Sequence, residues 1–487
     1  MAFHPSPSAT SRIRPLHLGL AAVIVVVGFL VRLQGAFGEL WFDEIWSLNA
    51  ALGLDAWHEA FWKLPKDNNH PLNTWWLYMM GPGRAPWVYH FLSVTTGTVS
   101  IVVAGWIAAR NVNHNRALRL LTAMALVAIL YPFVNFGSEA RGYGPMMLWA
   151  LLAFTSIEPI TTTAWQARWS YGIVGILGVL SHFAMLPILV ALSVTFGVRQ
   201  ILNGHTMVQA FQATVRLNGP LIGGLLVIVS GIFYGVSSQN VLLGFGGSTL
   251  TCVDQSCFGT ALDEMVRFST GGFEPQKPGL FSGLYIITMI GSVAWLAAIG
   301  NVRALPLGLI LVGIPALFYI SGQPAIPHGR YFFAVFVFVP VLIVEVMAEL
   351  KKRGRGASLL AMLSVVVLLA ANGWAVKQFL ATGRGDYAHA LTYILKNSKP
   401  GPIDIATEVN VQLKTVMDFN QHLQAPERNI QIVKYKDMPQ VKPPWLISVT
   451  IHTNHLPKTA CSGKLLYTLV HGYGHWGMAG STWGFIG

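Results

Sequence analysis

Long runs of apolar residues, separated by short polar segments, recur along most of this 487-residue chain. A helix needs about twenty apolar residues to cross the roughly 30 Å hydrocarbon core of a membrane. The pattern therefore predicts a multi-spanning α-helical membrane protein with about eleven transmembrane helices. The predicted spans cover residues 16–33, 87–108, 118–136, 143–157, 170–181, 183–198, 218–236, 281–299, 304–320, 331–349 and 357–377.

The first apolar run follows Arg12 and Arg14, an arrangement that also begins secretory signal peptides. No clear cleavage motif of small residues comes after the run, and many further spans follow it. We therefore interpret this run as a retained first helix.

Basic residues concentrate in alternate short loops, most densely at Lys351-Lys352-Arg353 and Arg355. Lys and Arg in short loops favour the cytoplasmic side of a membrane. This distribution predicts a cytoplasmic N-terminus, and an odd number of spans then places the C-terminal tail outside.

The outward segments are longer and define the domain organisation. Residues 1–380 form the predicted transmembrane domain, with outward loops at 34–86 and 236–280. The first loop has the amphipathic pattern of short helices at the membrane surface. Residues 381–487 form a separate tail.

The tail contains three short apolar runs, Ile403–Ala406, Ile430–Val433 and Leu446–Ile451, separated by Pro, Lys and Asn. Short apolar runs bounded by such residues are typical of strands. We therefore expect a small extracytoplasmic α/β domain at the C-terminus.

Composition agrees with a lipid environment. The chain is 53% hydrophobic and 11% charged, whereas soluble domains carry about 25% charged residues. The net charge of +12 would suggest nucleic-acid binding in a soluble protein. Here the basic residues lie in short loops, so topology explains them, and we expect the lipid bilayer rather than a nucleic acid as partner.

Two of the three cysteines, Cys252 and Cys257, share the second outward loop. They could form a small disulfide in an oxidising compartment, and two unrelated thiols are an equally good interpretation. No further Cys or His pair at metal-binding spacing accompanies them, so we predict no zinc site.

Two adjacent carboxylates, Asp43 and Glu44, follow the first span between aromatic residues. A carboxylate beside apolar rings tends to have a raised proton affinity, which suits a general base. Acidic residues also favour a solvated helix N-terminus. The spacing alone does not choose between these interpretations.

Two arginines, Arg141 and Arg330, lie on the predicted outward side, against the usual placement of basic residues. A guanidinium kept there indicates a ligand, and its planar fork suits phosphate. His328 lies beside Arg330, and His182 lies where two short spans meet on the same side. A lone histidine such as His182 is also common as a hydrogen-bonded interface residue.

The remaining first-loop candidate is His70 in the segment Asn68-Asn69-His70-Pro71, whose spacing alone favours a turn that enters an interfacial helix. The topology nevertheless places all seven candidates at one membrane face. These residues are Asp43, Glu44, His70, Arg141, His182, His328 and Arg330.

In their order along the chain, these motifs resemble the polyprenol-phosphate-dependent GT-C glycosyltransferases, near the protein-mannosyltransferase and aminoarabinose-transferase (ArnT-like) group. The likeness covers roughly residues 16–380. The chain departs from the group at Leu72-Asn73, where a second proline and an aromatic residue are usual, and this departure leaves the acceptor class open. The matching elements are Asp43-Glu44, His70-Pro71, Glu139-Ala140-Arg141-Gly142-Tyr143, Ser181-His182 and Arg330-Tyr331.

The resemblance implies an inverting glycosyltransferase that moves a hexosyl or pentosyl group from a polyprenyl-phosphate donor to a glycan, lipid or protein acceptor. Asp43 would be the base, and Glu44 would orient the acceptor or share that role. A phosphate clamp and an acceptor site would complete the set. The clamp would use Arg141 and Arg330 with His182 or His328, and the acceptor site would use His70, Glu139, Tyr143 and Tyr331.

A lipid monophosphate donor requires no cofactor, whereas a diphosphate donor would favour a divalent metal ion, on Asp43 or Glu44. The resemblance further implies a bacterial inner (plasma) membrane location, with the active site and tail facing the periplasm or exterior.

Three other functions fit parts of the sequence. A transporter or flippase usually places ionisable residues near the membrane midplane, whereas the predicted spans here are nearly free of charge and Glu345 lies close to a span's end. A polysaccharide polymerase or ligase would share the topology but has less use for the carboxylate pair. An assembly subunit whose tail binds a partner would not need acidic and basic residues at one face.

Overall fold

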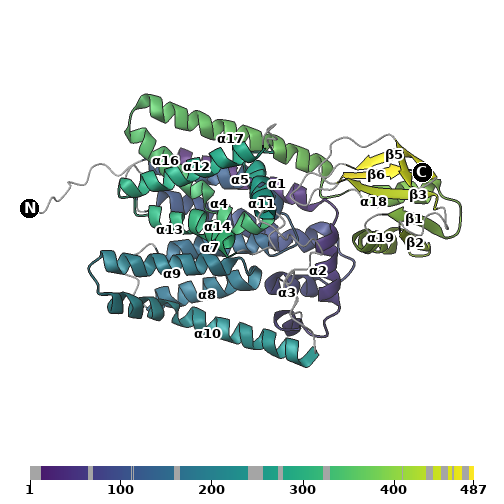
Figure 1. Ribbon diagram of the computed structural model, residues 1–487, viewed down its shortest axis with the longest axis horizontal. Coiled ribbons are helices and arrows are strands. Elements are labelled where there is room, and N and C mark those ends of the chain that lie inside the picture. Colours follow the sequence, from purple (N-terminus) through teal and green to yellow (C-terminus); the bar gives the residue numbers. More distant parts are fainter. Residues whose placement is uncertain are drawn as a thin grey trace, which may run out of the picture.

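The computed structural model describes most of the chain and is mainly helical (Figure 1). The described residues are 13–63, 70–110, 112, 115–157, 165–239, 256–272, 278–321, 329–385, 387–407, 410–434, 443–450, 459–462, 465–473 and 482–486.

Six described helices are long and apolar enough to cross a membrane, and they make the chain a multi-pass membrane protein. Their surfaces carry exposed apolar side chains such as Val26 and Val367, as lipid-facing helices require. These helices are α1 (Pro15–Ala36), α4 (Pro86–Ala109), α9 (Met185–Leu202), α10 (Met207–Gln239), α12 (Pro278–Ala298) and α17 (Arg355–Thr382).

Other predicted spans are short or broken helices. The segment Gly329–Phe336 and the helix after it bend by 47° and would make a seventh span if counted together. The prediction of about eleven spans is therefore not confirmed. The elements concerned are α5 (Arg116–Ile129), α6 (Tyr131–Phe136), α7 (Tyr143–Ser156), α8 (Trp165–Ser181), α13 (Ala304–Gly308), η2 (Leu309–Gly313), α14 (Ile314–Ile320), η3 (Gly329–Phe332), α15 (Phe333–Phe336) and α16 (Val339–Lys352).

Arg32 is a fully buried charge within α1, although the spans were expected to be nearly free of charge. Its guanidinium donates to the carbonyls of Val127 (2.7 Å) and Ala128 (3.2 Å). The break before Pro132 frees these carbonyls, because proline has no N–H and the N–H of Tyr131 donates instead to the side chain of Asn372 on α17. Arg32 thus provides hydrogen bonds to two backbone carbonyls, which lipid cannot provide.

Short helices occupy the loops that the sequence predicts to face outward. The first loop forms α2 (Phe42–Leu52), η1 (Trp57–Phe61) and α3 (Pro71–Met80), and the second contributes α11 (Ser256–Ser269). Figure 1 shows α2 and α3 between the long helices and the C-terminal strands.

The C-terminal unit is a mixed six-stranded sheet in the order β2-β1-β3-β6-β5-β4. Strand β1 runs parallel to β2 and β3, and the other pairs are antiparallel. The three apolar runs of the tail become β1, β2 and β3, which confirms the expected mixture of helices and strands. The elements are α18 (Tyr387–Asn397), β1 (Ile403–Thr407), α19 (Asn410–Gln424), β2 (Ile430–Lys434), β3 (Trp445–Thr450), β4 (Thr459–Ser462), β5 (Leu465–Tyr473) and β6 (Thr482–Ile486).

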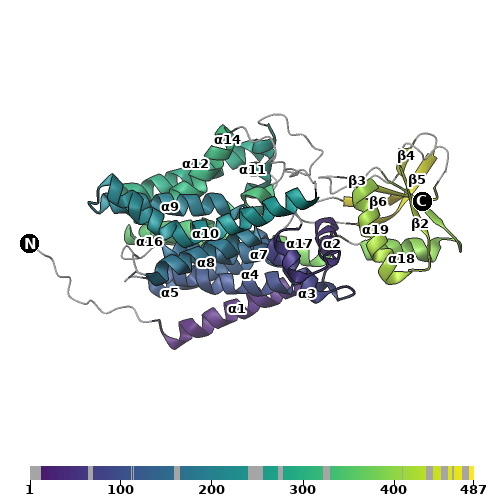
Figure 2. The same ribbon diagram turned by 90° about the horizontal axis from the view of Figure 1, so that it is seen from below.

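The C-terminal unit packs on the helices of loop 34–86 (Figure 2). One buried apolar cluster joins Ile45 and Leu48 of α2 to Leu391 of α18 and Leu413 of α19. Glu39, just before α2, accepts hydrogen bonds from the N–H of Ala388 at the start of α18. The loop that carries the candidate carboxylates is therefore covered by the tail.

Candidate active site

Asp43 and Glu44 both lie in the first turn of α2, and the Glu44 side chain caps this helix. Its Oε2 accepts a hydrogen bond from the N–H of Trp41, the residue before the helix (3.0 Å). A glutamate at the third helical position commonly caps a helix in this way.

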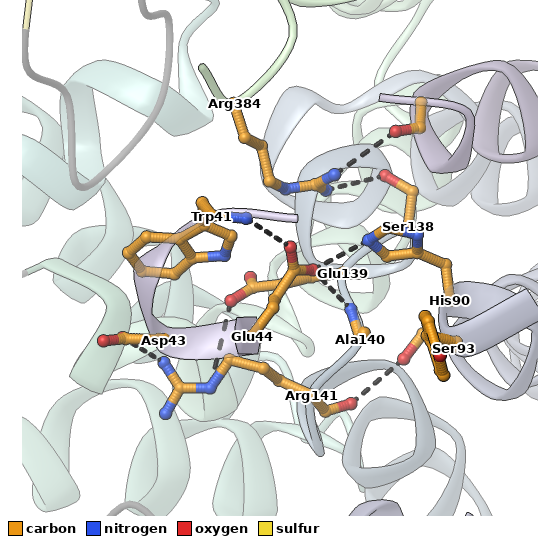
Figure 3. A network of polar contacts seen from close by, with 12 residues as sticks. Trp41, Asp43, Glu44, His90, Ser93, Ser138, Glu139, Ala140, Arg141 and Arg384 are labelled. Atoms are coloured by element: carbon orange, nitrogen blue, oxygen red, sulfur yellow. Dashed lines mark hydrogen bonds and ion pairs between the residues drawn. The ribbon is translucent and has the colours of Figure 1, made fainter. Parts of the chain in front are cut away.

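Asp43 lies between two arginines from distant parts of the chain. Its Oδ2 accepts hydrogen bonds from Nη1 of Arg141 (2.5 Å) and from Nη1 of Arg330 (2.8 Å). The Asp43 side chain is 10% exposed. Figure 3 shows its carboxylate pointing at the Arg141 guanidinium. Two guanidiniums thus converge on one anionic oxygen.

Glu44 points the other way, and both of its carboxylate oxygens have partners. Its Oε1 accepts hydrogen bonds from the N–H of Ala140 (2.6 Å) and contacts Nε2 of His90 on α4 (2.9 Å). Burial acts to raise the pKa of Glu44, but His90, Arg384 and the Ala140 N–H outweigh it and hold the pKa below its ordinary value. This carboxylate joins α2, α4 and the turn at residues 137–142.

The turn at residues 137–142 is fixed from three sides. Asn73 of α3 donates to the carbonyl of Ala140 (2.9 Å), and the Ser93 hydroxyl of α4 donates to the carbonyl of Arg141 (3.0 Å, Figure 3). A Cβ on Gly142 would lie 1.7 Å from the carbonyl oxygen of Ser181, so only glycine fits beside the end of α8. This packing sets the direction of the Arg141 side chain.

Glu139 is a buried carboxylate in the same turn. Its Oε1 accepts no hydrogen bond and lies 4.0 Å from Nε of Arg141. Burial raises the pKa of Glu139 to about 7, even though Arg141 and Arg384 act to lower it. Near neutral pH this group can therefore gain or lose a proton.

Three rings line the other side of Arg141. His70 stacks on His182 with ring centroids 4.6 Å apart, and Tyr143 lies 4.7 Å from His182. Nη2 of Arg141 contacts Nε2 of His70 (3.1 Å).

Burial, together with Arg141 and Arg330, lowers the pKa of His182 to about 3. The pKa of His70 is also well below its ordinary value because of burial. Nδ1 of His182 accepts the N–H of Ala184 (3.0 Å), so the neutral ring carries its proton on Nε2. His182 therefore offers a neutral hydrogen-bond donor beside Arg141.

Arg330 is positioned by η3, which is tied to α11 because the N–H of Gly329 donates to Glu264 (2.6 Å). Burial acts to lower the pKa of Arg330, but Asp43 outweighs it and the pKa is raised, so the guanidinium stays charged. Its guanidinium carbon lies 5.9 Å from the Trp41 ring and 5.8 Å from the Tyr331 ring.

The structure brings most of the sequence-predicted candidates together at one end of the bundle. His328 and Cys252 lie outside the described residues, as does the side chain of Cys257. The residues that meet are Asp43, Glu44, His70, Glu139, Arg141, Tyr143, His182, Arg330 and Tyr331.

Sequence reasoning missed His90 and Arg384. Arg384 follows α17 and donates to the carbonyl of Asn135 (2.5 Å) and to the hydroxyl of Ser138 (2.9 Å), next to Glu139. A basic residue on the predicted outward side was the signal that identified Arg141, and it applies equally to Arg384. His90 lies at the end of an apolar helix, where no sequence pattern distinguishes it.

Among the described residues, no three His, Cys, Asp or Glu side chains come together as a metal site.

No protein-family model matches the chain, and no curated protein matches it significantly. Solved structures do match. An oligosaccharyltransferase from Archaeoglobus fulgidus, in complex with zinc and sulfate, has a TM-score of 0.50 at 11% identity, over 88% of this chain and 68% of that one. The oligosaccharyltransferase AglB from the same organism, in complex with an inhibitory peptide and a dolichol-phosphate, has a TM-score of 0.49 at 12% identity, over 89% of this chain and 69% of that one.

ArnT from Cupriavidus metallidurans, bound to undecaprenyl phosphate, matches with a TM-score of 0.41 at 14% identity, over 96% of this chain and 97% of that one. At these identities a likeness concerns the fold. The resemblance expected from the sequence motifs is thus confirmed as one of fold: the chain has the fold of the A. fulgidus oligosaccharyltransferase, a GT-C glycosyltransferase.

Proposed function

We propose that this protein is an inverting glycosyltransferase, which moves a sugar from a polyprenyl-phosphate donor to an acceptor at the outer face of the membrane. The observation that carries the proposal is the convergence of Arg141 and Arg330 on one oxygen of Asp43. A general base and a phosphate clamp are then in direct contact.

The two arginines suit the leaving phosphate. A phosphate oxygen in the place of Asp43 Oδ2 would accept the same two charge-assisted hydrogen bonds. Their positive charge would stabilise the negative charge that grows on the phosphate as the glycosidic bond breaks. His182, neutral and protonated on Nε2, adds a donor on the same side of Arg141.

Asp43 is a weak base while two guanidiniums hold it, since opposite charges favour its ionised form. The donor phosphate competes for those guanidiniums, and its arrival frees the carboxylate. Asp43 then accepts the acceptor's proton as the acceptor oxygen or nitrogen bonds to the anomeric carbon. The bond from that carbon to the phosphate oxygen breaks on the opposite face, and configuration inverts.

Glu44 has a positioning role in this proposal rather than a share in the base role. Both of its carboxylate oxygens are engaged by N–H groups or by His90, and these contacts hold α2 against α4 and against the turn that carries Arg141. Glu139, whose pKa is about 7, lies behind Arg141, and its protonation state sets the net charge around that guanidinium.

The wider arrangement completes the proposal. Residues 1–380 form the catalytic membrane domain with about eleven spans, counting short and broken helices, and 381–487 form the extracytoplasmic domain. The site faces the periplasm or exterior of a bacterial inner membrane. A monophosphate donor needs no metal ion, whereas a diphosphate donor would bring a divalent ion to Asp43. The acceptor is a glycan, a lipid or a protein.

The proposal is tested by lipid and glycan mass spectrometry on the host carrying Asp43→Asn. Loss of the base lowers the transfer rate about 10²–10⁴-fold. We expect one polyprenyl-phosphate sugar to accumulate and one glycan modification to disappear.

The control is Asp55→Asn in the same loop, because Asp55 forms an exposed ion pair with Lys63 (2.6 Å) and should be dispensable. Unchanged lipids and glycans, with normally folded Asp43→Asn protein, would make the carboxylate structural and favour a transporter. Loss of a whole polymer rather than a single modification would favour a polymerase or ligase.

A further inference from the structure

A charged cavity lies at the end of the bundle opposite the candidate active site. It has a volume of about 960 Å³ and is lined by residues at the ends of α4, α9, α12 and α16. Along α4, His90 contacts the active-site residue Glu44, whereas Arg110 lines the cavity. Twenty residues at 1.5 Å each separate them by roughly 30 Å. Figure 1 shows α13 and α16 at the left, away from α2 and α3.

The cavity carries an excess of positive charge. Five basic side chains line it against two carboxylates, which leaves a net charge of +3. The basic residues are Arg110, Arg119, Arg199, Arg303 and Lys352, and the carboxylates are Glu345 and Glu349.

The carboxylates are already shared among these cations. Buried Glu345 accepts hydrogen bonds from both Arg119 and Arg303, the latter at 2.7 Å, and Glu349 pairs with Lys352 (2.7 Å). One negative charge between two buried guanidiniums leaves their cluster positive. Excess charge next to hydrocarbon is costly unless an anion or water compensates it.

One wall of the cavity is apolar and belongs to a lipid-facing helix. Val293 and Ala297 of α12 form part of it, and α12 is a candidate span that ends at Ala298. Leu305 and Leu309 extend the apolar surface. A soluble anion gains nothing from such a wall, whereas a lipid can place its phosphate on the basic residues and the start of an acyl chain along the wall.

We propose that this cavity binds the phosphate-bearing headgroup of an anionic glycerophospholipid from the membrane leaflet at that end of the bundle. The phosphate compensates the excess charge between α4, α9 and α16, and an acyl chain lies against α12. Basic pockets between membrane helices bind anionic lipid headgroups in this manner. The site is independent of the proposed glycosyl transfer.

The first test uses the purified full-length protein, stripped of lipid in detergent. Native mass spectrometry and thermal unfolding are measured with phosphatidylglycerol or cardiolipin, with phosphatidylcholine and with inorganic phosphate. We expect one retained anionic lipid and stabilisation by anionic lipids only. Equal stabilisation by phosphatidylcholine, or by inorganic phosphate alone, would overturn the proposal of an anionic lipid site.

The second test compares two double variants that remove the same charge. Arg199→Gln with Lys352→Gln changes the cavity, whereas Lys351→Gln with Arg355→Gln changes exposed residues outside it. Each basic residue near an anionic headgroup contributes roughly a fivefold factor, so the cavity variant should bind the lipid about 30-fold more weakly. The control should bind like the wild type, and equal losses in both would refute the site.

Arg199 also donates to the carbonyls of Ile157 (3.1 Å) and Val302 (2.6 Å), so the double variant could fold poorly. The single variants Lys352→Gln and Lys351→Gln then give the same comparison. We expect about fivefold weaker lipid binding for Lys352→Gln only. No difference between them would refute the site.

Discussion

Asp43 and Glu44 are neighbours in the sequence but have different partners in the structure. Asp43 meets two arginines, whereas Glu44 meets His90 and the N–H groups of Trp41 and Ala140. The sequence indicated a carboxylate pair and could not divide the roles, because successive helical residues point in directions about 100° apart and the partners come from distant segments. Arg141 and Arg330 were predictable, since basic residues are unusual on that side of the membrane.

Glu139 should make stability depend on pH. Its pKa of about 7 in the folded protein lies above the ordinary value of 4.5, so between these values the folded state holds a proton that the unfolded chain has lost. The contribution of Glu139 to the free energy of unfolding is fully present below about pH 4.5 and is lost as the pH rises through 7. Between pH 4.5 and 7, the unfolding temperature of the Glu139→Gln variant should therefore fall less than that of the wild type.

Two further variants calibrate the Glu139 experiment. Burial also raises the pKa of Glu264 to about 7, so Glu264→Gln should remove a similar contribution. Exposed Glu427→Gln should leave the pH profile unchanged. Identical profiles for wild type and Glu139→Gln, measured by thermal unfolding, would contradict the raised pKa.

Whole helices were easier to predict than their breaks. The ranges of α1, α4, α12 and α17 follow directly from uninterrupted apolar runs, because hydropathy reports what lipid requires. Pro132 marks the break between α5 and α6 in the sequence, but the groups that satisfy the freed backbone come from α1 and α17, which no local pattern records. The six long helices therefore do not by themselves confirm the predicted count of about eleven spans.

The turn between α6 and α7 requires glycine at position 142. Gly142→Ala would force its Cβ into the carbonyl of Ser181 and shift Arg141. Overpacking of this kind typically costs about 1–3 kcal/mol. We expect a lower unfolding temperature and loss of most transfer activity.

The matched control is Gly219→Ala, because a Cβ on this exposed residue of α10 would have no neighbour within 4 Å. It should be as stable and active as the wild type. If Gly142→Ala behaved in the same way, the turn would be less tightly packed than the structure indicates.

At the scale of the whole molecule, the tail is part of the structure that supports the site. Ile45 and Leu48 of α2 lie buried under α18 and α19. The sequence predicted the small α/β fold of the tail but not this contact, because the apolar faces involved are on segments more than 300 residues apart.

A chain that ends at Gly385 tests this contact. It keeps Arg384 and every proposed catalytic residue but exposes the apolar face of α2. We expect a lower unfolding temperature and weak or absent transfer in a reconstituted assay. A truncated chain as stable and active as the full one would make the tail a separate module.

Arg32 has a consequence for biogenesis. Ribosomes deliver α1 to the membrane long before α5, and until then the described acceptor of this guanidinium within its own helix is the carbonyl of Gly28. A cation near the end of a newly inserted helix stays at the water interface until partners arrive. The carbonyls of Val127 and Ala128 are such partners. Insertion of α5 therefore allows α1 to join the bundle, so these two helices assemble in the order in which they are translated.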